Sequence, residues 1–177
     1  GAISWFEADG TTAVTGNFAA AKVYVAKLTL AAKAGYTLTG VSVNSFTYTG
    51  ATSVANAANS GAVTITFSAT AFEPVTAIGA IAGIPISGQT LTAGALTPAG
   101  ATADYKWQVS ADGSTGWTDI AGATGNTYVV DLAKTAIGQY VRVVATGNGT
   151  YGATVNSAAV KIVTSVTAIG AVSGVPM

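Results

Sequence analysis

The strongest indication of fold in this chain comes from two stretches, DYKWQV at residues 104–109 and QYVRVVATG at residues 139–147. Each alternates between apolar and other side chains, so that one face of each stretch is largely apolar. The members of the apolar faces are Tyr105, Trp107 and Val109 in the first stretch, and Val141, Val143 and Ala145 in the second. Tyr140 and Arg142 fall on the opposite face of the second stretch. A period of two residues predicts β-strands with one face turned to a core.

The same pattern extends outward to earlier parts of the chain. KVYVAKLTLAA at residues 22–32 and AVTITF at residues 62–67 also alternate. Their apolar faces consist of Tyr24, Ala26, Leu28 and Leu30 in the first, and Val63, Ile65 and Phe67 in the second. Turn dipeptides punctuate the chain at Asp9-Gly10, Asp112-Gly113 and Asn148-Gly149. With no long segment of helical period, the sequence predicts an all-β protein made of β-sandwiches.

The chain divides into two modules and a tail. A boundary is expected within FEPVT, residues 72–76, because Pro74 cannot donate a ladder hydrogen bond and suits a linker or strand entry. We therefore expect a β-sandwich module over residues 1–73 and a second over residues 75–164. Residues 165–177 form a linker or the opening strand of a following module, since VTAIGAVSGVP at residues 166–176 repeats VTAIGAIAGIP at residues 75–85, with eight of eleven positions identical.

Composition excludes several classes of partner. Only 8% of the residues are charged, against roughly 25% in an ordinary soluble domain. The seven basic and seven acidic residues are scattered, which argues against nucleic acid as a partner. No stretch approaches the ~20 apolar residues of a membrane helix, so membrane insertion is not expected. A surface so poor in charge suits contact with copies of the chain or with neighbouring modules, although a compositional bias of the source is the alternative.

The residue inventory also restricts chemistry. The chain has no histidine and no cysteine, which excludes a Ser-His-Asp triad, a thiol nucleophile and a Cys/His zinc site. It begins at Gly1 with neither an initiator methionine nor a signal peptide, so we expect a processed protein or a piece of a larger one. We predict no enzyme activity, no catalytic residue and no cofactor.

Acidic residues are the remaining candidates for chemistry. Glu7 and Asp9 would share a strand face, and paired carboxylates can hydrolyse glycosides, but both belong to a turn where solvated charges are common. Four other carboxylates could supply oxygen ligands to calcium: Asp104, Asp112, Asp119 and Asp131. No calcium-loop motif accompanies them, and Asp112-Gly113 has the pattern of a hairpin tip. The sequence therefore predicts no metal site.

Residues 76–163 resemble the immunoglobulin-like repeats of large bacterial secreted and cell-surface proteins. The resemblance depends on YKWQVSADGSTGW at residues 105–117, IAGATGNTYVV at residues 120–130 and IGQYVRVVATG at residues 137–147. It implies an immunoglobulin-like sandwich in which Trp107 is the buried tryptophan. Thr135-Ala136 stands where such repeats usually have an acidic approach to the following corner. Tyr140 invites the role of a tyrosine corner, but its face is opposite to Val141, and the assignment stays open.

The first module resembles another repeat of similar surface proteins more loosely, through ISWFEADG, VYVAKLTLAAKAGYTLTG and VTITF. Such families are extracellular spacers, stalks and assembly modules. The resemblance thus implies a structural module array of a filament, stalk or surface layer at the cell surface. Its units would assemble head to tail through β-strand contacts.

The repeated tail supplies the expected assembly strand. We expect it to be extended and to pack against another chain or the module junction through Val166, Ala168, Ile169, Val172 and Val175. The alternative function is a carbohydrate-binding or adhesive module.

In that alternative, Trp117 and Tyr151 would stack on sugar rings. Asn148-Gly149-Thr150 matches a glycosylation sequon, although a hairpin turn explains the same residues. A glycan is therefore a candidate partner, either as a bound ligand or as a covalent modification.

Overall fold

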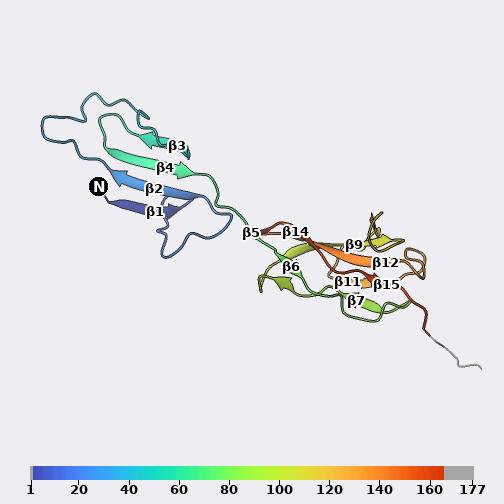
Figure 1. Cartoon of the computed structure of the whole chain (residues 1–177). Helices are drawn as coiled ribbons and strands as arrows, with labels where there is room; N and C mark the ends of the chain where they lie inside the picture. The colour runs from blue at the N-terminus through green and yellow to red at the C-terminus, as the bar shows by residue number, and fades with distance from the viewer. Residues whose placement is uncertain (1, 166–177) are drawn as a thin grey trace, which may run out of the picture. The chain divides into compact units, whose positions relative to one another are not determined.

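The computed structural model describes residues 2–165, and its regular structure in that range consists of β-strands without a helix (Figure 1). The predicted all-β class is therefore confirmed. The contacts within the chain group into two units, one ending at Glu73 and the other beginning at Pro74. We call them unit 1 and unit 2.

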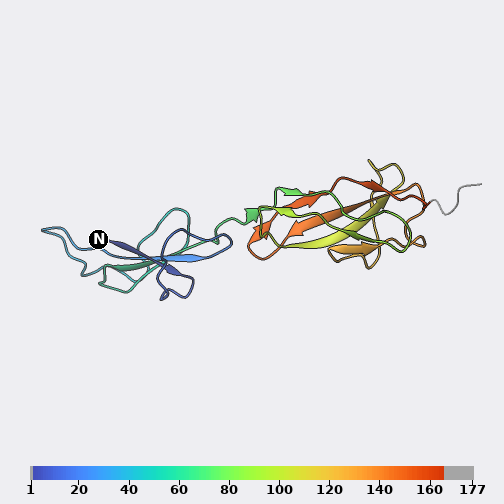
Figure 2. The ribbon, with the colours of Figure 1, turned by 90° about the horizontal axis from the view of Figure 1, so that it is seen from below.

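Unit 1 is built on one antiparallel sheet of four strands in the order β1-β2-β4-β3. The strands are β1 (Ile3–Glu7), β2 (Tyr24–Thr29), β3 (Ala51–Asn56) and β4 (Ala62–Phe67). Trp5 lies opposite Ala26, Ala26 opposite Ile65, and Ile65 opposite Val54, so the apolar sides of the four strands share one face. Figure 2 shows these strands as a single layer.

Loop aromatics cover the apolar face of this sheet. The Phe18 ring lies 4.9 Å from that of Trp5 and 4.4 Å from that of Tyr24, measured between centroids. Tyr48, also from a loop, packs edge-on against Phe67 at 5.8 Å. In the described part of unit 1, loop side chains thus stand where a second sheet would stand. Aromatic rings can bury a sheet face without further strands, and the β-sandwich expected for residues 1–73 stays a prediction.

Unit 2 contains several antiparallel pairings. Its strands are β5 (Glu73–Pro74) at the boundary, β6 (Ala77–Ile78), β7 (Thr90–Thr92), β8 (Leu96–Thr97), β9 (Ala103–Ser110), β10 (Thr118–Asp119), β11 (Thr127–Val129), β12 (Tyr140–Gly147), β13 (Tyr151–Gly152), β14 (Thr154–Asn156) and β15 (Val160–Lys161). The largest sheet has the order β10-β9-β12-β14, with β15 also paired to β12. Smaller sheets pair β7 with β11, β6 with β8, and β5 with β13.

The core of unit 2 lies between the largest sheet and the β7–β11 pair. Trp107 of β9 and Leu91 of β7 are both 0% exposed and belong to one cluster of buried side chains. The Trp107 ring lies 5.6 Å from that of Tyr128 in β11, and its indole N–H donates to Gly125 O at 3.0 Å. The prediction that Trp107 is buried is confirmed. Tyr140 lies half-buried on the other side of β12, whereas Tyr128 is buried with its hydroxyl 3.3 Å from Thr135 Oγ1.

Candidate functional site

The opening segment of unit 2, residues 75–85, is fastened along its length. Val75 is 2% exposed, and its N–H donates to Gly152 O at 2.9 Å. Ile81 is 9% exposed and belongs to the core cluster. The next residue, Ala82, exchanges two hydrogen bonds of 2.9 Å with Thr92. The segment therefore contributes both buried apolar area and backbone pairing to unit 2.

One glycine of this segment cannot be replaced by a residue with a side chain. Gly83 has φ of +111°, and a Cβ atom at this position would lie 2.4 Å from Thr90 O. Neither the backbone angle nor the space admits a side chain. Ala82 and Ile84 on either side are exposed, so those two positions are tolerant.

The second copy of this segment lies outside the described residues. The predicted assembly residues are all in it: Val166, Ala168, Ile169, Val172 and Val175. The chain approaches it through Val163, whose N–H donates to Pro85 O at 3.0 Å. The described residues that precede the second copy therefore lie against the end of the first copy.

The outward face of the large sheet carries a connected polar network. Register places Asp119, Gln108 and Arg142 in one row across β10, β9 and β12. Gln108 Nε2 donates to Asp119 Oδ1 at 2.8 Å, and Arg142 Nε donates to Gln108 Oε1 at 2.9 Å. Lys106 Nζ lies 2.9 Å from Asp119 Oδ2. The bond from Gln108, followed by that from Lys106, lowers the pKa of the Asp119 carboxyl below its ordinary value.

Two cations on this face lie over aromatic rings. The guanidinium carbon of Arg142 is 4.3 Å from the centroid of the Trp117 ring. Lys161 Nζ is 5.6 Å from the centroid of Tyr140, the residue directly opposite it across the β12–β15 pair. Both distances are within the range of cation–π attraction. The face thus combines oriented cations with aromatic side chains.

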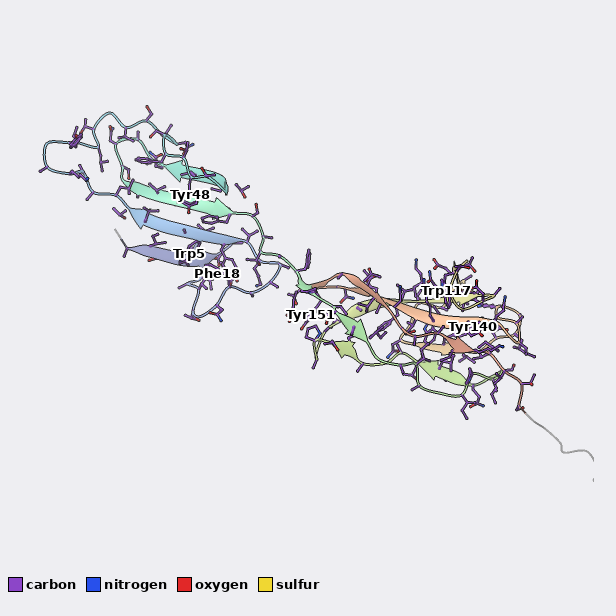
Figure 3. All side chains as sticks on the ribbon, viewed as in Figure 1. Trp5, Phe18, Tyr48, Trp117, Tyr140 and Tyr151 are labelled. Atoms are coloured by element: carbon purple, nitrogen blue, oxygen red, sulfur yellow. The ribbon has the colours of Figure 1, made fainter. Side chains whose placement is uncertain are left out.

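The two aromatics predicted to stack on sugars are not brought together. Figure 3 shows Trp117 near Tyr140 at one end of unit 2 and Tyr151 at the other end. Both side chains are half-buried, Trp117 with one ring face against Arg142 and Tyr151 within β13. Sequence reasoning named Trp117 but missed Arg142 as its partner. The alternation of residues 139–147, which turned Arg142 away from the core, was the available signal.

The two Asp-Gly turns have the same construction in both units. Asp9 Oδ1 accepts from the backbone N–H groups of Thr11 and Thr12, at 2.8 and 2.9 Å, and Oδ2 accepts from Thr12 Oγ1 at 2.6 Å. In the turn of unit 2, Asp112 makes the same three bonds to the two residues at the same spacing, at 2.8, 2.8 and 2.6 Å. The two turns have the sequences DGTT and DGST, so their similarity can be recognised from the sequence alone.

These bonds determine the protonation of the two aspartates. The hydroxyl of Thr12, with backbone N–H bonds, holds the pKa of Asp9 well below its usual range. Thr115 does the same for the pKa of Asp112. The Glu7 carboxylate pairs with a different group from Asp9: its Oε2 atom lies 3.5 Å from Lys22 Nζ. Both turn aspartates are therefore ionised caps of their own loops.

The four aspartates considered for calcium have separate partners. Asp104 accepts from Asn148 Nδ2 at 2.9 Å, and Asp131 accepts from the backbone N–H of Ala133 at 2.9 Å. Asp112 and Asp119 are engaged as described above. Within residues 2–165, no three carboxylates gather around a common point. The same range contains no helix that is long and apolar enough to span a membrane.

A shallow hollow of about 550 Å³ lies over the β11 side of unit 2. Its charged lining residues are Asp131 and Lys134, and Lys134 Nζ donates to Ala121 O at 3.1 Å. The rest of the lining comes mainly from residues 122–125 and 127–130, where Gly122 has φ of +77°, together with Ser87, Gly88 and Leu132. These residues shape a loop, and the contacts of the hollow indicate no chemistry.

Comparison with known proteins places unit 2 in a family. Residues 78–166, just over half of the 177, match the family described as a domain of unknown function (DUF8696). The chain belongs to this family. The match begins within β6 and covers the large sheet and the network on its outward face. Neither the curated proteins nor the solved structures contain a match to the chain.

Proposed function

We propose that this protein is a structural module array of an extracellular filament, stalk or surface layer, whose units join head to tail through the strand at residues 166–176. The observation that carries the proposal is the repeat of residues 75–85 at residues 166–176. The contacts of the first copy indicate which residues of the repeat are required for packing.

The second copy keeps an equivalent of each residue that packs in the first copy. Val166 corresponds to the buried Val75, and Val172 to the buried Ile81. Gly174 corresponds to Gly83, the position that admits no side chain. The changes fall at Ile81, at Ala82 and at Ile84, where the new residue is a smaller aliphatic or a serine. The tail therefore contains what an opening strand of this kind requires.

The corresponding place in unit 2 is already filled by residues 75–85. A second opening strand would serve either a following unit of a longer chain or a neighbouring copy by strand addition. Both routes join the end of one unit to the start of the next. A contact of this head-to-tail kind propagates into a filament unless rotation closes it. The low charge supports the same proposal, because little repulsion keeps such units apart.

The test compares the full chain with three variants by negative-stain electron microscopy and light scattering. Deletion of residues 166–177 and the substitution Gly174→Val should abolish polymers, because a valine at this position would collide with the receiving strand. Ser173→Ala is the matched control, since the first copy has alanine at the corresponding exposed position, and it should polymerise like the parent chain. Polymers that persist in Gly174→Val, or a parent chain that stays monomeric at high concentration, would overturn assembly by strand exchange between copies.

A further inference from the structure

The only arginine of the sequence is held in one orientation on the outward face of unit 2. The guanidinium of Arg142 stacks on Trp117 at 4.3 Å, and its Nε donates to Gln108 Oε1 at 2.9 Å. The amide of Gln108 is itself oriented by its bond to Asp119, which also pairs with Lys106. A ring on one side and a fixed amide on the other leave the guanidinium little freedom.

The outer edge of this guanidinium is open. Among residues 2–165, neither Nη atom of Arg142 has a hydrogen-bond or ion-pair partner. Lys161 is exposed, and in the same range its ammonium has a ring below it but no carboxylate beside it. The nearest acid in the row, Asp119, is engaged by Gln108 and Lys106. Two positive charges on one face are thus left without a counter-charge.

The register of the strands places the two cationic residues on a diagonal. Lys161 lies directly opposite Tyr140, and Arg142 follows Tyr140 by two residues on the same face of β12. The backbones of such diagonal neighbours on an antiparallel pair are about 7–8 Å apart. The Arg142 side chain extends toward Gln108 and Trp117, so an oligosaccharide lying along this face, rather than a single sugar ring, is the ligand that would contact both cations.

We propose that this face binds an acidic oligosaccharide, with the ring carboxylate of a uronic acid on the two Nη atoms of Arg142 and the charge of Lys161 beside another part of the same oligosaccharide. A planar guanidinium presents two parallel donors that match the two oxygens of a carboxylate. Its fixed orientation lowers the entropy cost of binding. This site is independent of assembly through the tail, so failure of either proposal leaves the other standing.

The same features favour a sugar acid over other anions. Nucleic acid affinity depends on many phosphate contacts, and this face offers two free cations. An acidic peptide carries its carboxylates on flexible side chains, each of which loses rotamer freedom on binding. A uronic acid holds its carboxylate on a rigid ring and adds hydroxyl groups that can bond to neighbouring side chains such as Gln108.

The single arginine permits a direct test by NMR on the full chain. The Nε–Hε resonance of Arg142 is unique, and it is followed during titration with tetragalacturonate at low salt. We expect saturable shifts of this resonance and of the Trp117 indole, weakened by added salt. A neutral tetrasaccharide should leave both resonances unchanged. Equal shifts with the neutral sugar, no shift with tetragalacturonate, or binding of tetraglutamate in its place would overturn the proposal.

Variants then assign the contacts. Arg142→Lys keeps the charge but loses the fork, and we expect affinity to fall about tenfold or more. Lys161→Gln should lower affinity by a smaller factor, about twofold to fivefold. Lys27→Gln is the matched control, because Lys27 also lies over a ring, that of Phe6 at 5.1 Å, but in unit 1. The indole resonance of Trp107 reports whether each variant is folded, and a folded Arg142→Lys variant with full affinity would contradict the assignment.

Discussion

Units 1 and 2 are both β-structures, but they bury their apolar faces by different means. In the part of unit 1 that the structure describes there is one sheet, and its buried cluster consists of Ala26, Val63 and Ile65. Unit 2 places strands on both sides of a cluster of ten buried residues that includes Trp107 and Leu91. A cover made of loops leaves its aromatics partly exposed, with Phe18 at 47% and Tyr48 at 55%. We infer that unit 2 holds its core more tightly than unit 1.

One tryptophan in each unit tests this difference in core packing. Trp107→Ala should destabilise unit 2 by about 3–5 kcal/mol, because it empties a site that is fully enclosed. Trp5→Ala should cost unit 1 only about 1–2 kcal/mol, because Trp5 is half-buried against Phe18 and Phe67. Denaturant unfolding followed by the NMR signals of each unit measures both. Equal losses of stability in the two units would show that the loop cover encloses Trp5 as completely as a second sheet would.

A buried polar side chain in each unit tests the same difference through smaller losses of stability. Asn56, 5% exposed in unit 1, donates to Ser42 O and Ala57 O at 2.9 Å and accepts from the N–H of Ser45 at 2.9 Å. Asn56→Ala leaves these loop groups without partners, and we expect a loss of about 2–3 kcal/mol.

The matched change in unit 2 is Ser110→Ala. Ser110 Oγ accepts from the N–H groups of Asp112 and Gly113, at 3.2 and 3.1 Å. These bonds fasten a turn that is largely exposed, so we expect a loss of about 1 kcal/mol. Amide hydrogen exchange should show that Asn56→Ala opens the loop of residues 42–46, whereas Ser110→Ala loosens only its own turn. Faster exchange throughout unit 2 in Ser110→Ala would contradict this ranking.

The smallest expected effect concerns the feature that the units share. The pKa values of Asp9 and Asp112 are depressed in the folded state, so each turn is stabilised at pH values above the ordinary aspartate pKa of about 3.9. This contribution disappears as the pH falls through the depressed folded values. NMR titration of the carboxyl carbons should give both midpoints below about 3.9. Thr12→Val and Thr115→Val should each raise the midpoint of their own aspartate and leave the other unchanged.

Much of the strand pattern could be predicted, and the reason is local. The alternating stretches at residues 22–32, 62–67, 104–109 and 139–147 coincide, to within a few residues at the ends, with β2, β4, β9 and β12, the central strands of their sheets. A strand with neighbours on both sides has one face in the core, so its pattern is strong. β3, with the sequence ATSVAN, lies at the sheet edge and has only a weak pattern.

The candidate site was less accessible to prediction. Trp117 and Arg142 are 25 positions apart, and their contact depends on the register that joins Asp119 to Gln108 and Gln108 to Arg142. Periodicity gives the face of a residue but not its partner on the next strand. The cover of unit 1 was missed for a similar reason, because Phe18 and Tyr48 come from loops without a period.

Local order and spacing are enough to give the β class, the outward face of Arg142, the burial of Trp107 and the repeat of the opening strand. Three other features depend on tertiary contacts: loops cover the sheet of unit 1, Gly83 admits no side chain, and Arg142 lies over Trp117 with both Nη atoms unpaired among residues 2–165. Each of these depends on segments that are distant in the chain. Close packing and strand register bring such segments together, and neither is encoded in any one of them.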